Sequence, residues 1–248
     1  MKLYAVVPIH YGSDYLQWAI RSVYDVAYEI GVFIMRCPWQ DVATLIPRLE
    51  NDDEIERIAR SYDPENKIYV ERLLGFHFQE DQWIHLTTRA QTQGAEWVLR
   101  LPPDEVWPRE TLDFYLEYAD FYKSSVIKVP RRHFWRSFQW SCSDNFRADR
   151  FIRCNGGGEA REGPEMRENL WHFGYARKPY DILYRTMLKW YQSGWRNGWF
   201  EGTFLQFPNR KADLHPFAEG IWNATAYDPK RFPAMMEDHP YWPMAVIE

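Results

Sequence analysis

Residues 99–110, LRLPPDEVWPRE, place two adjacent carboxylates, Asp104 and Glu105, directly after a short apolar run. Carboxylate oxygens are the ligands that Mg²⁺ and Mn²⁺ prefer in proteins, and Mn²⁺ also accepts imidazole. His172, in the segment LWHFGY, is the imidazole that we consider beside Asp104. Together they could hold a divalent cation. The same residues also allow plain structural roles, with Asp104 at a strand end or helix cap and His172 packed in a core.

The framework around these residues follows from the periodicity of the apolar positions. The β-branched and aromatic run at 2–9 predicts a buried strand, and the turn HYGSD leads into a helix with Leu16, Ile20 and Val23 on one face. Ser13 or Asp14 is its expected N-cap. Further strands are predicted at 30–35, 67–73, 96–101, 124–130 and 149–154, and helices at 40–49, 53–61, 81–95, 109–122 and 178–194. Alternating strands and helices indicate an α/β fold with a mainly parallel sheet, in which ligands bind at the carboxyl ends of the strands.

Composition excludes several classes of protein. The chain has 248 residues and 46% hydrophobic content, and its three cysteines follow the spacing of neither a disulfide framework nor a zinc site. The formal net charge of −5 argues against general nucleic-acid binding. No run approaches the roughly 18 apolar residues that a membrane span requires. We therefore expect a cytoplasmic protein with one sizeable core and no membrane span.

Residues 123–167 form a local basic region, with 10 Lys or Arg against 5 Asp or Glu. Electrostatic fields act locally, so this region could face an anionic ligand even in an acidic protein. Within it, the Gly-rich stretch 156–169 predicts a mobile loop. The arginines that we consider are Arg131, Arg132, Arg147, Arg150 and Arg153. The last three stand three residues apart, a spacing that aligns side chains on a helix and scatters them over both faces of a strand.

Three motifs, in this order, resemble those of glycosyltransferases of the GT-A type, in particular the family 2-like branch. They are VVPIHYGSDYLQWAIRSVYD, EWVLRLPPDEVW and LWHFGYARKPYDILYRTMLKWY, and the resemblance covers about residues 2–194. It implies a GT-A, Rossmann-like nucleotide-sugar transferase fold with a mainly parallel central sheet flanked by helices. In the family's Asp-x-Asp motif the first acid is replaced here by Pro102. A proline supplies no ligand, so this departure either weakens metal binding or shifts it to Asp104, Glu105 and His172; the resemblance implies Mn²⁺ or Mg²⁺ as the cofactor, with Asp104 and His172 as the ligands.

The resemblance also implies the residues that contact the donor. Pro8, His10 and Tyr11 match positions that line the nucleotide base pocket, and Arg89 resembles a basic residue that precedes the Asp-x-Asp strand. An ordinary surface arginine is an equal alternative for Arg89. The acid that commonly follows the second strand is missing.

The family's inverting members use a carboxylate as general base, and several acids here compete for that role. Asp144, Glu159 and Glu162 qualify by position, and Glu105 stands beside the metal motif. We favour Glu165, which precedes the His172 element. A base must come within roughly 3 Å of the acceptor hydroxyl. A retaining enzyme would need no such base.

The sequence therefore predicts a glycosyltransferase domain over 1–194, with a nucleotide-binding half at 1–122 and an acceptor half at 123–194. Residues 195–248 form a C-terminal extension. The expected partners are a nucleotide-sugar donor and a carbohydrate or other hydroxyl acceptor. Two alternatives stay open, a catalytically inactive nucleotide-sugar-binding module and a nucleotidyltransferase, although HYGSDY lacks the basic residue of a phosphate loop.

Overall fold

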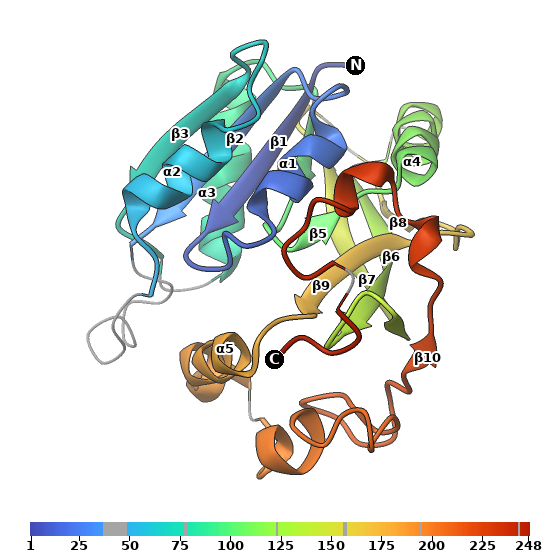
Figure 1. Ribbon diagram of the computed structural model, residues 1–248. Helices are drawn as coiled ribbons and strands as arrows, with labels where there is room; N and C mark the ends of the chain where they lie inside the picture. Colours follow the sequence, from blue (N-terminus) through green and yellow to red (C-terminus); the bar gives the residue numbers. More distant parts are fainter. Residues whose placement is uncertain (37–48, 77–78, 123, 156–157, 194, 243) are drawn as a thin grey trace. The chain divides into compact units, whose positions relative to one another are not determined.

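The computed structural model describes residues 1–36, 49–76, 79–122, 124–155, 158–193, 195–242 and 244–248 (Figure 1). The chain forms two compact units. Unit 1 contains residues 1–130 and 147–170, and unit 2 contains residues 131–146 and 171–248. No helix of the described residues is both long and apolar enough to cross a membrane.

Unit 1 is built on a parallel sheet with the strand order β3-β2-β1-β4. These strands are β1 (Leu3–Ile9), β2 (Glu29–Met35), β3 (Ile68–Leu73) and β4 (Trp97–Arg100). On the outer side of β4, strand β7 (Trp140–Arg153) pairs antiparallel, with Leu99 opposite Phe151. The prediction of an α/β fold with a mainly parallel sheet flanked by helices is confirmed.

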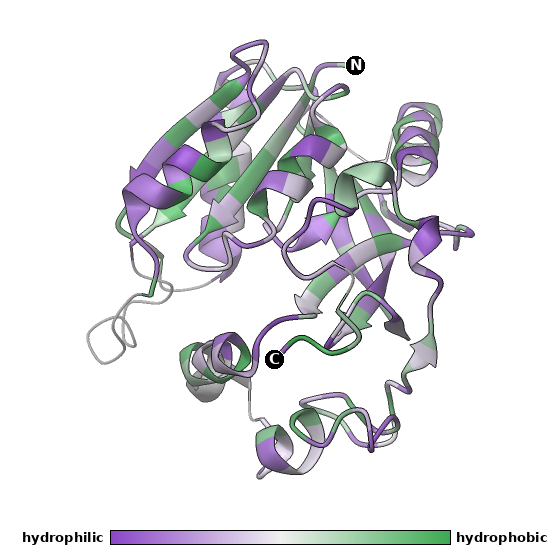
Figure 2. Ribbon diagram, viewed as in Figure 1, coloured by the Kyte–Doolittle hydropathy of each residue, from purple (hydrophilic) through white to green (hydrophobic). Residues whose placement is uncertain are grey.

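Helices cover both faces of this sheet, because side chains of each strand alternate between the faces. On one face Ala5 and Val7 of β1 pack with helices α1, α2 and α4, and on the other Tyr4 and Val6 pack with α3. In Figure 2 β1 is mainly green, the colour of hydrophobic residues, as a strand buried on both faces requires. The helices are α1 (Leu16–Val23), α2 (Asp52–Arg60), α3 (Gln79–Thr92) and α4 (Arg109–Tyr122).

The helices follow their sequence signals with one exception. In α2, Asn51 caps the first turn by accepting a hydrogen bond from the Asp53 amide at 2.8 Å. The predicted cap of α1 by Ser13 or Asp14 is wrong, because Tyr15 occupies the N-cap position without a side-chain bond. Helix α1 is stabilised by burial instead. Its residues Leu16 and Ile20 are fully buried, and burial of each such side chain contributes about 1.5–3 kcal/mol to the stability of the fold. The helix predicted at 40–49 lies almost wholly outside the described residues.

The remaining strands are longer or more numerous than predicted. Strands β6 (Val126–Trp135) and β7 extend through the aromatic segment HFWRSFQW, which separates into two strand ends and the turn between them. The Gly-rich segment contains β8 (Ala160–Glu162), which pairs in parallel with β6. LWHFGY forms β9 (Leu170–Tyr175), followed by α5 (Pro179–Ser193). Two-residue β5 (Glu105–Val106) follows β4.

Unit 2 has little regular structure after α5 and is held by buried aromatic rings. Its core joins Trp135, Tyr175, Trp199 and Trp222 with Phe204, and the rings of Trp135 and Tyr175 stack at 5.3 Å. Aromatic pairs of this kind add to the free energy gained by burial alone. The short elements here are a π-helix (Phe200–Phe204), β10 (Thr225–Ala226) and two 3₁₀ turns (Pro229–Arg231 and Ala234–Met236).

Candidate functional site

The order of the parallel strands defines where unit 1 can bind a ligand. The chain runs from β1 to β2 to β3 in one direction across the sheet, and β4 then pairs on the opposite side of β1. The order therefore reverses between β1 and β4. In open α/β sheets such a switch point leaves a crevice at the carboxyl ends of the two strands. The segments that leave β1 and β4, residues 10–13 and 101–105, begin at this edge.

The β1 exit carries three of the predicted donor-binding residues, Pro8, His10 and Tyr11, all half-buried. The Nδ1 atom of His10 lies 2.8 Å from the Met35 carbonyl oxygen, which ties the turn to the end of β2. This bond fixes the ring at the carboxyl edge of two neighbouring strands. The sequence placed these residues correctly at a strand exit, and their proposed contact with a nucleotide base stays a prediction.

Glu50 also belongs to the β1 exit, and sequence reasoning missed it. Its carboxylate accepts hydrogen bonds from the amides of Gly12, at 2.6 Å, and Ser13, at 3.1 Å. Gly12 has a φ of 93°, a conformation that favours glycine and that aims its amide at the carboxylate. An acid 38 residues away gives no local sequence signal, so only the fold reveals that this turn binds an anionic group.

The β4 exit positions Asp104. The Leu101 amide still pairs with the Val6 carbonyl oxygen at 3.0 Å, and the Glu105 amide then closes a turn on the Pro102 carbonyl oxygen at 3.1 Å. Pro102 and Pro103 fix φ inside that turn, so the backbone before the acid has few alternative conformations. The Asp104 side chain is buried, with 8% of its surface exposed.

Glu105 is fully buried and binds Arg150 of β7. Its two carboxylate oxygens accept from Nε and Nη2 of the guanidinium, both at 2.6 Å. A planar, bidentate pair is the geometry in which burial of two charges is best compensated. Because both of its carboxylate oxygens bind Arg150, Glu105 holds the segment that carries Asp104 in place.

Arg100, the last residue of β4, is a second cation at this exit that the sequence analysis did not single out. Its nearest carboxylate oxygen is that of Asp149, at 3.9 Å, and its guanidinium lies over the Trp83 ring at 5.1 Å. Its buried Nε atom has no hydrogen-bond partner among the described residues. Burial lowers the pKa of Arg100 below its ordinary value, although the group remains a cation at neutral pH. A partly compensated cation at a strand exit is suited to an anionic ligand.

The arginines of the basic region that lie on β7 do not form one surface. Because Arg147, Arg150 and Arg153 lie on β7, their spacing distributes them over both faces of a strand. Arg147 pairs with Glu162, Arg150 with Glu105, and Arg153 lies over the Trp97 ring. Each is engaged with a different neighbour.

Two further predicted residues of unit 1, Arg89 and Glu165, lie on other segments of the chain. Arg89, on α3, donates to the Tyr69 hydroxyl at 2.7 Å and pairs with Glu71 at 2.9 Å, both on β3. Glu165 is exposed in the segment after β8. That segment is held by α4, since the Tyr115 hydroxyl donates to the Pro164 carbonyl oxygen at 2.5 Å. Burial raises the pKa of Tyr115, so it keeps its proton over the ordinary pH range.

His172 belongs to unit 2 and is 6% exposed. Its Nδ1 atom lies 2.9 Å from Nδ1 of His133, so one ring donates the proton and the other accepts it. A Cβ atom on Gly174 would overlap both the His172 ring and the guanidinium of Arg185. The positively charged guanidinium of Arg185 therefore lies near the His172 imidazole, and it would repel a cation bound to that ring.

These observations bear on whether the residues suit a divalent cation. Among the described residues, no group of three or more His, Cys, Asp or Glu side chains is arranged to hold a metal ion. Mg²⁺ and similar ions are commonly bound through one or two protein groups together with substrate phosphates and water. Asp104 suits that sparse arrangement, and the metal remains a proposal.

Comparison with known proteins gives a likeness of fold only. No protein-family model and no curated protein matches the chain. Among solved structures, S. aureus TarS is 13% identical with a TM-score of 0.45, covering 84% of this chain and 44% of TarS. TarS 1–349 is 12% identical with a TM-score of 0.43, covering 76% of this chain and 64% of that one. Mannose-1-phosphate geranyltransferase from Thermus thermophilus is 14% identical with a TM-score of 0.38, covering 63% of this chain and 51% of that one.

This chain thus spans less than two thirds of the length of each of these proteins. At this level of similarity, neither their substrates nor their activities carry over to it.

Proposed function

We propose that this protein transfers a sugar from a nucleotide-sugar donor to a carbohydrate or other hydroxyl acceptor. The observation that carries the proposal is the buried carboxylate of Asp104 at the exit of β4, beside the point where the strand order reverses. The order of the three sequence motifs supports the same class of reaction.

Transfer of a sugar breaks the bond between its anomeric carbon and the donor diphosphate, so negative charge accumulates on phosphate oxygens. Arg100 would face part of this charge as a fixed cation. Asp104 would hold Mn²⁺ or Mg²⁺, which would supply the remaining positive charge when bound, and the part of His172 as a second ligand stays a prediction from the sequence. Pro8, His10 and Tyr11 would position the base of the nucleotide, whereas Arg89, which contacts β3 instead, has no part in this scheme.

The acceptor side requires a group that removes the proton of the attacking hydroxyl. Glu165 is the proposed base, because it is exposed and can take up a proton from an acceptor that approaches from solvent. Glu105 contributes in this scheme by fixing the segment of Asp104 through its bond to Arg150.

The decisive experiment compares the wild-type protein with Asp104→Asn in the presence of a panel of nucleotide sugars, with and without Mn²⁺. Wild-type protein should show a rise in Tm, and it should release the nucleoside diphosphate as water or an added glycoside accepts the sugar. In Asp104→Asn, turnover should fall by about 10²–10³, the usual loss when one charge-stabilising group is removed. Asp113→Asn, an exposed acid on α4, is the matched control and should keep full activity.

Turnover that stays at the untreated wild-type level both in EDTA and in Asp104→Asn would overturn the metal assignment. A rise in Tm with no turnover by any donor would favour the alternative, an inactive nucleotide-sugar-binding module.

A further inference from the structure

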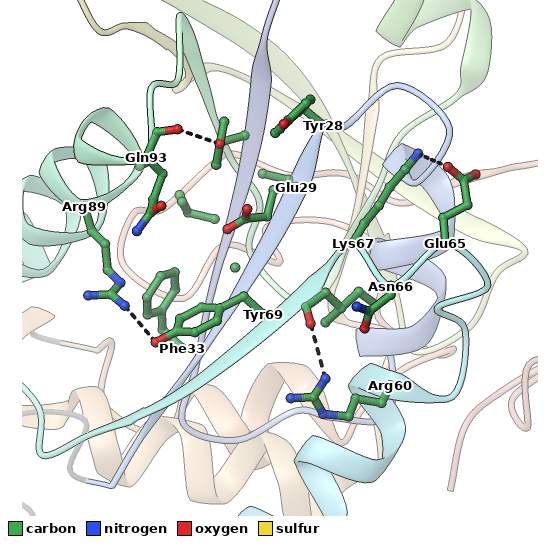
Figure 3. A pocket seen from close by; sticks show the side chains of 16 residues that line it. Tyr28, Glu29, Phe33, Arg60, Glu65, Asn66, Lys67, Tyr69, Arg89 and Gln93 are labelled. Carbon is green, nitrogen blue, oxygen red and sulfur yellow. Dashed lines mark hydrogen bonds and ion pairs between the residues drawn. The ribbon is translucent and has the colours of Figure 1, made fainter.

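A separate pocket of about 630 Å³ lies on the face of unit 1 that α3 covers only in part (Figure 3). Its volume falls within the range of small-molecule sites, about 300–1,000 Å³. The pocket is lined by the amino-terminal half of β1, by β2 as far as Phe33, by the start of β3 and the turn before it, and by the end of α3. It lies at the opposite end of the strands from Asp104.

The register of the strands explains why the sheet is hollow here. Val6 of β1, Gly31 of β2 and Tyr69 of β3 lie side by side in one row, and the middle member has no side chain. The Phe33 ring occupies the space just above Gly31, since a Cβ atom there would come within 2.6 Å of that ring. Glycine inside a strand is typical of places where another group approaches the backbone closely.

Aromatic rings form much of the pocket wall, and two of them are open to solvent. Tyr28 is 58% exposed and Tyr69 is 39% exposed, whereas Tyr4 and Phe33 are buried beneath them. Tyr4 is fixed by its hydroxyl, which donates to the Gln93 carbonyl oxygen at 2.8 Å. Lys2 lies over one face of the Tyr28 ring at 4.3 Å and Arg89 over one face of the Tyr69 ring at 5.1 Å, so each ring offers its remaining exposed surface to a ligand.

The cations of the pocket are each paired with an acid of the same unit. Lys67 pairs with Glu65 at 3.0 Å, Arg60 with Glu56 at 3.0 Å, and Arg89 with Glu71 at 2.9 Å. The charges of these three cations are therefore largely compensated. Lys2 also lies beside the pocket, 4.3 Å from the centroid of the Tyr28 ring, and its charge is opposite to that of Glu29, so the pocket has no strong net demand for an ionic ligand.

Glu29 differs from these groups. Its side chain lines the pocket between Tyr28 and Gln93, and no described residue donates a hydrogen bond to its carboxylate (Figure 3). An ionised carboxylate accepts hydrogen bonds at two oxygens and donates none. A ligand with adjacent hydroxyl groups could donate to both, while Gln93, Asn66 and Arg89 offer further polar atoms around it.

From these features we infer that the pocket binds a neutral sugar ring, with its hydroxyl groups on Glu29 and its C–H face against Tyr28 or Tyr69. The pocket has exposed aromatic rings and compensated charges, and no described residue donates a hydrogen bond to the Glu29 carboxylate. These features match a polyhydroxylated ligand better than an anion. The inference does not rest on the proposed function, because no residue of the β1 or β4 exit contributes to the pocket. It adds a carbohydrate-binding site remote from the proposed site of transfer.

The test is saturation-transfer NMR of the whole protein with three probes: methyl β-D-glucopyranoside, methyl N-acetyl-β-D-glucosaminide and methyl α-D-mannopyranoside. At least one should receive saturation at its ring C–H protons. Glu29→Gln, which keeps the shape of the side chain, and Tyr28→Ala, which removes an exposed ring, should each weaken that probe's binding about tenfold. Tyr180→Ala on α5 removes a ring of similar exposure, 63%, and should leave binding unchanged.

Circular dichroism of each variant checks that the fold is intact. Absence of saturation transfer to all three glycosides would overturn the inference. Saturation transfer that is as strong in Glu29→Gln and Tyr28→Ala as in the wild-type protein would also overturn it, since the sugar would then be bound elsewhere. Choline and uridine serve as additional probes, and a signal from either one without any signal from a glycoside would also exclude a sugar site. Asp104→Asn should retain glycoside binding, which separates this result from failure of the proposed transfer.

Discussion

The exits of β1 and β4 are neighbours at the same edge of the sheet, and each holds one carboxylate by a different means. At the β1 exit, the amides of Gly12 and Ser13 bind the half-buried Glu50. At the β4 exit, the guanidinium of Arg150 binds the fully buried Glu105. Backbone amides are neutral and can turn to water, whereas a buried guanidinium cannot lose its partner without a large cost. The β4 exit should therefore be rigid and the β1 exit adaptable.

The largest expected effect that tests this difference comes from Glu105→Ala. The substitution leaves the Arg150 charge buried without a partner, and breaking a buried pair in this way typically lowers the free energy of unfolding by about 3–5 kcal/mol. Urea denaturation followed by circular dichroism measures the change.

The double variant Glu105→Ala/Arg150→Met removes both charges and should recover part of the lost stability. If Glu105→Ala instead unfolds at nearly the wild-type urea concentration, the β4 exit is no more rigid than the β1 exit.

A smaller effect is expected from Glu50→Ala. Two amides lose their acceptor, but the turn is partly open to water, so the free energy of unfolding should fall by about 1–2 kcal/mol. Hydrogen exchange at the Gly12 and Ser13 amides should accelerate. Glu54→Ala, on the surface of α2, is the control and should leave exchange at those two amides unchanged. Slow exchange in Glu50→Ala would show that the turn is rigid without its carboxylate.

The smallest expected effect belongs to Arg100→Met. Although Arg100 is also at the β4 exit, its nearest carboxylate oxygen is 3.9 Å away and burial lowers its pKa. Replacing a poorly compensated cation by an apolar side chain of similar length is often neutral or stabilising, so the free energy of unfolding should change by less than about 1 kcal/mol. A loss as large as that of Glu105→Ala would mean that Arg100 shares the rigid anchor of Glu105 and Arg150.

Much of unit 1 could be predicted because its signals are local and repeated. The runs 2–9, 30–35 and 67–73 are apolar strands between turn residues, and the helix at 109–122 has a regular apolar face, so all four appear near the expected bounds. The turn residues before α1 did not predict its N-cap correctly. Tyr15 takes the place of the expected Ser13 or Asp14, because burial of the helix outweighs a capping bond.

Features that depend on distant pairs could not be predicted. The bond between Glu105 and Arg150 joins residues 45 positions apart, and the bond between Gly12 and Glu50 joins residues 38 apart. The aromatic segment 133–140 has large apolar side chains in nearly every position, so neither strand nor helix periodicity stood out. For the candidate site, the sequence correctly placed Asp104 and the residues after β1 at strand exits, but it could not show that Arg89 contacts β3.

Residues 131–146 interrupt unit 1 in the sequence, so strands that are neighbours in its sheet are synthesised at different times. When the first 130 residues have left the ribosome, β4 has an open outer edge, since its partner on β7 has not yet been made. That edge includes Val98 and Leu99, and an unpaired apolar strand edge promotes association between chains. A nascent chain that stalls before about residue 153 should therefore depend on chaperones until β7 arrives to cover β4.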